Sequence, residues 1–174
     1  MPKLTAIIYW LVPAKLKGEL FRELIRILAE QFDAPRFEPH LTLLASTDRR
    51  QSASKILRQI HASPIRLRVR GITSSSKFTK TLFVRFESNK SLKKLATDLG
   101  RAARTPATSL RDPHLSLLYK KLSAPVKKEL AATIRLPFRE VTFPSIIAVR
   151  SSLPIRSRSD VEAWKVVARK RLSG

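Results

Sequence analysis

The chain has 174 residues, and its 43% apolar content is enough to bury a sizeable core. It has no cysteine and only three histidines, which excludes disulfide frameworks and thiolate metal sites and leaves little material for a metal cage. With 35 Lys and Arg against 13 Asp and Glu, the formal net charge is +22. That charge favours polyanionic partners such as RNA, phosphorylated metabolites or an acidic surface, although a generic basic surface explains it equally well.

The sequence shows no membrane or targeting signal. No apolar run approaches the roughly 18 residues that are needed to cross a bilayer. The N-terminal MPKLTAIIYWLVPAK has a short apolar stretch but lacks the basic start and the small-residue cleavage site of a signal peptide. We therefore expect a cytoplasmic protein with no membrane association.

Hydrophobic periodicity predicts strands and helices along the whole chain. In order, these are a strand over 5–11, a helix ending near 32, a strand over 40–45, a helix around 56–60, strands over 65–71 and 81–87, a helix around 92–99, a strand over 114–119, a helix around 126–134 and strands within 139–153 and 162–172. Leu20, Leu24, Ile27 and Leu28 recur at helical spacing and mark the apolar face of the first helix.

The segment IRLRVRG, residues 65–71, alternates strictly between apolar and basic side chains. Its arginines, Arg66, Arg68 and Arg70, therefore share the solvent face of a half-buried antiparallel strand, with TLFVRFE at 81–87 as hairpin partner. This face is either a solvated sheet surface or a track for phosphate groups.

This order of elements predicts an α+β fold of antiparallel sheets with helices packed on their outer faces. No low-complexity linker divides the chain. We therefore expect residues 1–174 to form a single compact domain.

One heptapeptide occurs twice. EPHLTLL at residues 38–44 returns as DPHLSLL at residues 112–118, with five letters identical and two conservative swaps. Two of the three histidines lie in this repeat. Because each copy falls in a strand-like element of its own half, the repeat predicts two related lobes, which contribute the His-x-Thr/Ser motifs at 40–42 and 114–116.

Residues two apart on a strand point to the same face, so His40 projects with Thr42, and His114 with Ser116, while the intervening leucines face the core. Across a cleft, one neutral imidazole can take a proton from water while the other, protonated, donates to a leaving alkoxide. The hydroxyls can hold phosphate oxygens during in-line attack. This chemistry needs no metal and no cofactor, and it suits a cyclic phosphodiester.

A single His-x-Thr/Ser motif is weak, because chance produces it often and a lone histidine on a strand is more often structural. Two copies in matching PHL[T/S]LL frames favour a catalytic role over a structural one.

The paired motifs resemble those of the two-histidine (2H) phosphoesterases. The resemblance is closest to the cyclic phosphodiesterase branch typified by plant and yeast enzymes, through VPAK, FDAPRFEPHLTL, DPHLSLLYKKLS and the closing AVRSS and VEAWKVVA. It runs over most of the chain and is strong at the two motifs. It implies a bilobal fold with two antiparallel sheets facing a central cleft, helices on the outside and a pseudo-two-fold axis.

The same resemblance implies an activity. The branch hydrolyses nucleoside 2′,3′-cyclic phosphates to 2′-phosphates, or ADP-ribose 1″,2″-cyclic phosphate to the 1″-phosphate. By this resemblance His40 and His114 form the acid–base pair, with His114 expected as base and His40 as acid, and Thr42 and Ser116 hold the phosphate.

The resemblance also suggests substrate-binding residues outside the two motifs. Trp10 in the first strand can stack on a base or ribose, and Tyr119 follows the second motif closely. Strand alternation puts Tyr119 on the core side unless the strand bulges, and burial in the core is the alternative role for both residues. Phe78, with Lys77 and Lys80 beside it, lies in the loop that relatives bring near the substrate.

Two other functions stay open. An RNA-end processing enzyme of the same superfamily, acting on RNA 2′,3′-cyclic phosphates or 2′-5′ linkages as a 2′-5′ RNA ligase-like protein, is favoured by the charge. A basic RNA-binding module without catalysis leaves the repeat unexplained. We expect a monomer whose partners are a cyclic nucleotide or ADP-ribose cyclic phosphate, with RNA as a further partner of the basic surface.

Overall fold

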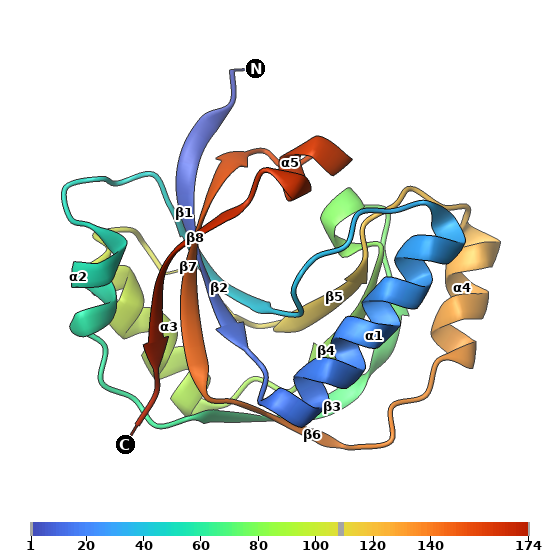
Figure 1. Ribbon diagram of the computed structural model, residues 1–174. Helices are drawn as coiled ribbons and strands as arrows, with labels where there is room; N and C mark the ends of the chain where they lie inside the picture. The colour runs from blue at the N-terminus through green and yellow to red at the C-terminus, as the bar shows by residue number, and fades with distance from the viewer. Residues whose placement is uncertain (1, 108–109, 174) are drawn as a thin grey trace.

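The computed structural model describes residues 2–107 and 110–173 and has the α+β architecture predicted from the sequence (Figure 1). The strands are β1 (Leu4–Val12), β2 (Leu41–Ser46), β3 (Ile65–Ser74), β4 (Leu82–Phe86), β5 (His114–Leu118), β6 (Glu140–Phe143), β7 (Ser145–Leu153) and β8 (Lys165–Arg171). The helices are α1 (Lys15–Phe32), α2 (Ala53–Arg58), α3 (Lys90–Ala102), α4 (Ala124–Thr133) and α5 (Arg158–Glu162), with a short 3-10 helix η1 (Phe78–Lys80).

The strands form one antiparallel sheet in the order β6-β3-β4-β5-β2-β1-β7-β8. Its centre is the junction of β2 with β5, where Leu41 and Leu115 are the register partners. The two sheets expected from the sequence are therefore the two halves of a single curled sheet. One half is β2-β1-β7-β8 and the other is β5-β4-β3-β6. The two repeated histidines lie at the central strands: His40 directly precedes β2, and His114 is the first residue of β5.

The two halves repeat the same run of elements. The order β1-α1-β2-α2 returns as β4-α3-β5-α4, and the second strand of each run belongs to one copy of the heptapeptide. α1 packs on β5 and α3 packs on β2, so each helix crosses to the neighbouring half, while α2 covers β8 and α4 covers β3 (Figure 1). This crossing joins both halves in one hydrophobic core.

The leucines of both motifs lie in that core, as strand alternation predicts. Leu41, Leu43, Leu115 and Leu117 are each at most 1% exposed. Burying such side chains contributes about 2 kcal/mol each, so the strands that carry the motifs are rigidly held. The opposite faces of β2 and β5 are left to build a cavity.

The first helix was predicted in the right place, and half of its predicted apolar face is confirmed. Leu28 is buried and Leu24 packs against the core, whereas Leu20 and Ile27 are 51% and 46% exposed. Phe21 and Ile25 are buried instead, so the buried face is turned from the predicted one. Two apolar faces overlap on this helix, and periodicity alone does not choose between them.

The C-terminal region also differs from the prediction. Residues 139–153 form two strands, β6 and β7, as the prediction allows, but α5 covers residues 158–162, of which only Glu162 lies in a segment predicted as strand and the rest had no predicted element. A capping box starts this helix: the Ser157 side chain accepts from the Asp160 backbone N–H, and the Asp160 carboxylate accepts from the Ser157 N–H. Within the described residues, no helix is long and apolar enough to cross a membrane.

The predicted hairpin of β3 with β4 is confirmed. Its arginine face is interrupted, however, because the register shifts between Val69 and Gly71, at Arg70. Glu140 of β6 lies 3.4 Å from Arg66 and is the register partner of Arg68. The face is therefore partly neutralised by its own sheet, which favours a solvated surface there over a track for phosphates.

Candidate active site

A cavity of about 270 Å³ lies over the junction of β2 and β5. Six of the seven residues predicted for the site line it, and these are Trp10, His40, Thr42, His114, Ser116 and Tyr119. The seventh, Phe78, does not line the cavity. Its ring centroid lies 5.9 Å from that of Tyr119, so it supports the wall from behind.

The two imidazoles are held in the same way. Nδ1 of His40 lies 2.6 Å from the Glu38 carbonyl oxygen, and Nδ1 of His114 lies 3.2 Å from the Asp112 carbonyl oxygen. A carbonyl only accepts, so each Nδ1 carries the proton and donates it to the backbone. In the neutral form, Nε2 of each ring is thus left with its lone pair free to accept a proton.

The acidic residue that opens each heptapeptide is anchored by cations. The Glu38 carboxylate accepts from Arg22 of α1 at 2.8 Å. The Asp112 carboxylate accepts from Lys80 at 3.0 Å and from Arg85 at 2.9 Å. Each side chain thus fixes the backbone whose carbonyl orients the histidine two residues later, which gives the Glu/Asp position of the repeat a physical reason.

The hydroxyl groups of Ser116 and Thr42 differ in burial and in hydrogen bonding. The Ser116 hydroxyl is buried and donates to the Thr79 carbonyl oxygen at 2.7 Å. The Thr42 side chain is exposed, and within the described residues its hydroxyl has no hydrogen-bond partner. Thr42 can receive a phosphate oxygen directly, whereas Ser116 must first turn away from the carbonyl.

Aromatic rings enclose His40. Trp10 stacks on it with ring centroids 3.6 Å apart, and Trp164 meets it edge-on at 5.8 Å. The His40 side chain is only 5% exposed, and this burial lowers its pKa to about 4, although the Glu38 carbonyl opposes the shift. His40 is therefore neutral at pH 7.

His114 has polar surroundings. It is half-buried, and its ring meets the edge of Phe83 at 5.4 Å. Burial lowers the pKa of His114, the Asp112 carbonyl opposes this, and the positive charge of Lys80 adds to the lowering.

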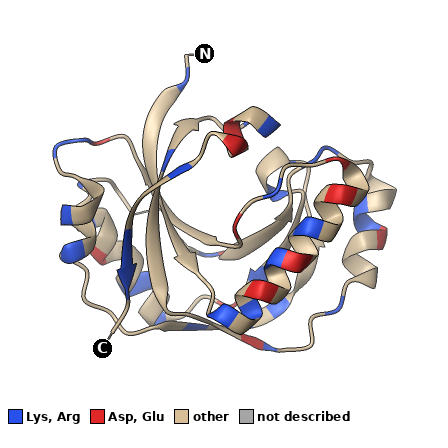
Figure 2. Ribbon diagram, viewed as in Figure 1, with Lys and Arg blue, Asp and Glu red and all other residues tan. Residues whose placement is uncertain are grey.

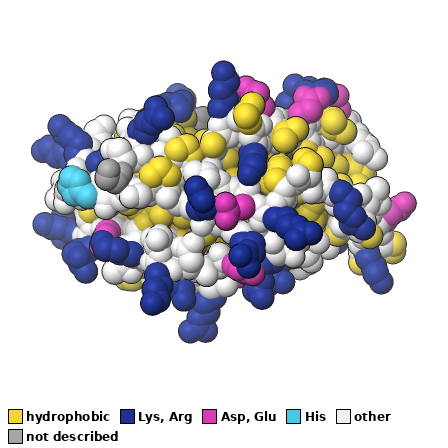
Figure 3. Space-filling view, turned by 90° about the horizontal axis from the view of Figure 1, so that it is seen from below, with side chains coloured by type: hydrophobic (Ala, Val, Ile, Leu, Met, Phe, Trp, Pro, Cys, Tyr) yellow, Lys and Arg dark blue, Asp and Glu magenta, His cyan; other side chains and the backbone are white. Residues whose placement is uncertain are grey.

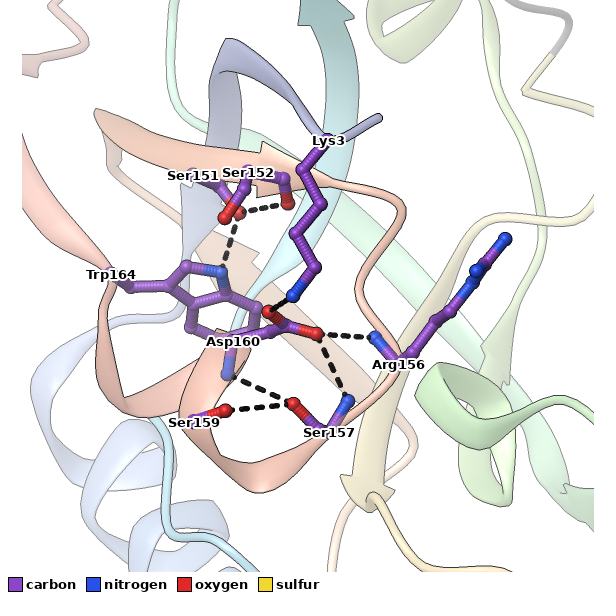
Figure 4. Close-up of polar contacts among 8 residues, drawn as sticks. All are labelled: Lys3, Ser151, Ser152, Arg156, Ser157, Ser159, Asp160 and Trp164. Atoms are coloured by element: carbon purple, nitrogen blue, oxygen red, sulfur yellow. Dashed lines mark hydrogen bonds and ion pairs between the residues drawn. The ribbon is translucent and has the colours of Figure 1, made fainter. Parts of the chain in front are cut away.

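The sequence did not indicate Trp164 as a site residue, because its local pattern predicted a strand. The structure places it on the cavity wall, with its ring centroid 4.9 Å from that of Trp10. Its indole N–H donates to Ser151 Oγ at 2.8 Å, which fixes the ring plane (Figure 4). That Trp164 is the second of only two tryptophans was the one signal that could have suggested it.

A buried carboxylate anchors the segment that carries Trp164. Asp160 of α5 is 4% exposed and accepts from the backbone N–H groups of Arg156 and Ser157 at 2.9 and 3.1 Å (Figure 4). It also pairs with Lys3, which directly precedes β1, and this hydrogen bond is the main reason that its pKa is lowered to about 2. The ion pair of Lys3 with Asp160, which we call the latch, joins the segment that carries Trp164 to the start of β1, the strand that carries Trp10.

Tyr119 reaches the cavity because β5 ends at Leu118, so strand alternation no longer governs its direction. It stacks on Phe37 with ring centroids 4.0 Å apart. Burial raises the pKa of its phenol, so the hydroxyl stays protonated.

The two lysines expected beside Phe78 do not line the cavity. Lys77 is exposed, while Lys80 forms an ion pair with Asp112.

Within the described residues, no group of three or more His, Cys, Asp or Glu side chains is placed to hold a metal ion. The polar groups that converge on the cavity are two imidazoles and several hydroxyls. Such a set is suited to moving protons and to holding anionic oxygens.

The family model of the cyclic phosphodiesterase-like proteins matches residues 5–172. The chain belongs to this family of 2H phosphoesterases. A search of the curated proteins finds no match.

The fold is also that of solved 2H phosphoesterases. E. coli LigT complexed with phosphate aligns over 99% of this chain and 100% of its own, with 16% identity and a TM-score of 0.55. TT0787 of Thermus thermophilus aligns over 96% and 97%, with 20% identity and a TM-score of 0.58. At these identities the solved structures support the fold alone. The phosphoesterase class rests on the match to the family model.

Proposed function

We propose that the protein is a metal-independent cyclic phosphodiesterase that opens nucleoside 2′,3′-cyclic phosphates, or ADP-ribose 1″,2″-cyclic phosphate, by acid–base catalysis between His40 and His114. One observation carries the proposal: both rings line a single cavity, and each donates Nδ1–H to the backbone so that Nε2 is free for proton transfer. The hydroxyls of Thr42 and Ser116 lie in the same cavity.

In this mechanism the base takes a proton from water, and the water oxygen attacks phosphorus in line with the departing ribose oxygen. The acid gives its proton to that oxygen, so the ring opens to a phosphomonoester. Thr42 and Ser116 donate hydrogen bonds to the non-bridging oxygens, whose negative charge grows in the transition state.

We assign His40 as the base and His114 as the acid, the reverse of the order expected from the sequence. The base must be neutral before reaction, and His40, with its pKa lowered to about 4, is the more deeply buried ring. The acid must hold a proton, and an anionic phosphate bound in the cavity favours the protonated form of a histidine, so this role falls to His114, the less buried of the two rings.

The substrate class is supported by the ligands of a protein with the same fold. E. coli LigT has been solved with phosphate, with 3′-AMP, with ATP and with NADP+. These ligands are phosphate or carry it, and all but phosphate are nucleotides. A cavity that joins an aromatic wall at Trp10 and Trp164 to hydroxyl donors suits a ribose phosphate with its base.

The test is hydrolysis of adenosine 2′,3′-cyclic phosphate in excess EDTA, followed by phosphorus NMR. We expect turnover to one phosphomonoester isomer, whose chemical shift identifies the bond that breaks. ADP-ribose 1″,2″-cyclic phosphate is the second substrate. Failure to open either ring contradicts the proposal, and opening only at the 2′,3′-cyclic end of an oligoribonucleotide favours the RNA-end enzyme instead.

A further inference from the structure

Half of the net positive charge, +11 of +22, lies at one end of the molecule. Residues 15–38, which include α1, hold five basic and five acidic side chains, and several of these form ion pairs with each other. By contrast, residues 48–58 with α2 hold four basic and one acidic, residues 90–104 with α3 hold five and one, and β8 holds four and none. We call these last three segments together the basic face.

The three segments are neighbours in space. α2 packs on both β8 and α3, and Lys170 of β8 donates to the Arg58 carbonyl oxygen at 3.5 Å. In Figure 2 this end of the molecule is dominated by Lys and Arg, whereas α1 alternates between the two signs. The view from below shows Lys and Arg at that end and also over the rest of this side (Figure 3). A uniform drift in composition would give every part of the chain a similar density of charge, so the concentration of half of the net charge on three segments indicates a surface.

Most of these cations are free to meet a ligand. Within the described residues, the ion pairs of the basic face are Arg50 with Asp48, and Lys94 and Arg101 with Asp98. The other ten basic side chains form no ion pair there, although Arg104 lies near enough to Asp48 to lower the pKa of that carboxyl. These ten are Arg49, Lys55, Arg58, Lys90, Lys93, Arg104, Lys165, Arg169, Lys170 and Arg171.

A cavity of about 580 Å³ lies in this face and is separate from the catalytic one. Thr5 and Ile7 of β1 line it, whereas Ile8 and Trp10 line the catalytic cavity on the other side of the sheet. Arg49 and Arg150 border it, together with hydroxyl and amide side chains and with Asp48, whose charge is paired with Arg50. Guanidinium, hydroxyl and amide groups are the donors that proteins use to contact phosphate oxygens.

We propose that the basic face is a docking surface for the phosphate backbone of double-helical RNA. The three segments contain no Phe, Tyr or Trp, so they offer no platform on which unpaired bases could stack. Among the large apolar side chains of these segments that the structure describes, Val166 is the exposed one. One such side chain is too little apolar surface to insert into a bilayer. What the surface offers is many positive charges on three adjacent segments, which suits the closely spaced phosphates of a duplex bound without regard to sequence.

The test is fluorescence anisotropy of the full chain with a labelled RNA duplex of about 20 base pairs and with one of its strands alone. If the face neutralises about five phosphates, affinity falls roughly 500-fold between about 50 mM and about 200 mM salt. The variant Lys55→Glu/Arg58→Glu/Arg169→Glu/Arg171→Glu should lose affinity at least about 30-fold and show a shallower salt dependence.

The matched control reverses four exposed cations outside the basic face: Lys121→Glu, Lys128→Glu, Arg135→Glu and Arg139→Glu. It carries the same net charge as the test variant and should lose less than about threefold. Equal losses in both variants overturn the proposal, because binding then follows net charge alone. Tighter binding of the single strand, or binding of phosphatidylserine vesicles without duplex, overturns it too. Circular dichroism and thermal unfolding test whether both variants are folded. A variant that does not fold is replaced by one in which the same residues are changed to glutamine.

Discussion

The two copies of the heptapeptide have the same backbone geometry and different surroundings. In each, the histidine Nδ1 is bonded to the carbonyl two residues earlier. His40 is then enclosed by Trp10 and Trp164, whereas His114 has the positive charge of Lys80 near it. A repeated seven-residue frame is thus enough to orient two imidazoles alike, while the proton affinity of each ring is set mainly by residues outside the repeat.

This difference is useful for catalysis. Two identical rings in identical settings would titrate together, and neither would be reserved for one role. Separate surroundings push the two pKa values apart, which is how enzymes assign acid and base roles to residues of one type.

The largest expected effect comes from removing either ring. His40→Ala and His114→Ala should each lower kcat/KM for adenosine 2′,3′-cyclic phosphate by about 10²- to 10⁴-fold, the usual contribution of a general acid or base. A diester with a p-nitrophenolate leaving group separates the roles, because that group departs without a proton. His114→Ala should regain most of its activity on this substrate, and His40→Ala should not.

His61→Ala is the control, since the third histidine is exposed and does not line the cavity. The opposite recovery, in which only His40→Ala is rescued, would restore the order of roles expected from the sequence. Full activity in both cavity variants would remove the acid–base proposal altogether.

The burial of His40 should also make the free energy of unfolding depend on pH. Its folded pKa of about 4 lies below the ordinary 6.5, so at low pH the unfolded chain takes up a proton that the folded chain refuses. The stabilisation is complete above pH 6.5 and is lost as the pH falls to 4, by up to about 3 kcal/mol. Urea unfolding at several pH values measures this, and His40→Gln should flatten the slope where His61→Gln does not. A slope that His40→Gln leaves unchanged contradicts the burial of a neutral ring.

The strands and the two motifs could be predicted because their signals are local. Alternation places Leu41 and Leu115 inward, and a repeated heptapeptide needs no knowledge of the rest of the chain. The wall around His40 could not be predicted, since Trp164 reaches it only through a short helix and a latch from Lys3 to Asp160. That contact depends on the pairing of β7 with β1 and β8, which no local pattern specifies.

Charge shows the same limit. The net value of +22 was plain from composition, and Arg66, Arg68 and Arg70 were its most regular cluster. In the sheet that cluster meets Glu140 and a register shift, whereas ten cations of the basic face form no ion pair. The partner of Arg66 is distant in sequence, so its pairing could not be predicted from the local pattern.

The two hydroxyls should differ when removed. Thr42→Ala deletes a side chain that is free in the structure, so it should lower kcat/KM about tenfold and leave the free energy of unfolding unchanged. Ser116→Ala also leaves the Thr79 carbonyl unsatisfied, and it should lose about the same activity and about 1 kcal/mol of stability. Kinetics and urea unfolding of the pair measure both quantities, with Thr42→Ser as the variant that restores activity. Equal losses of stability would show that the free hydroxyl of Thr42 is also structural.

The smallest effects should come from the two carboxylate clamps. Glu38→Gln removes an exposed pair with Arg22, which is worth at most about 1 kcal/mol. It also removes a charge that raises the pKa of His40, so it should move only the acid limb of the pH profile of kcat/KM, slightly to lower pH, and leave activity at pH 7 unchanged. Asp112→Asn instead leaves Lys80 and Arg85 without their counter-charge beside His114. Two uncompensated cations disfavour protonation of that ring and lower its pKa further, so the alkaline limb of the profile should move to lower pH. At pH 7 we expect a loss of several-fold.

The pair of variants separates geometry from charge. Both carboxamides keep the shape of the side chain and a carbonyl oxygen for the cation, so a purely positional role predicts small and equal losses with no shift of the profile. An electrostatic role predicts a shift of the alkaline limb for Asp112→Asn only, because the Glu38 charge acts on the other ring, His40, whereas Asp112 and Lys80 act on His114. A shift for Glu38→Gln of the same size would mean that the two copies of the motif are tuned in the same way, and that the contrast between them lies in the aromatic wall alone.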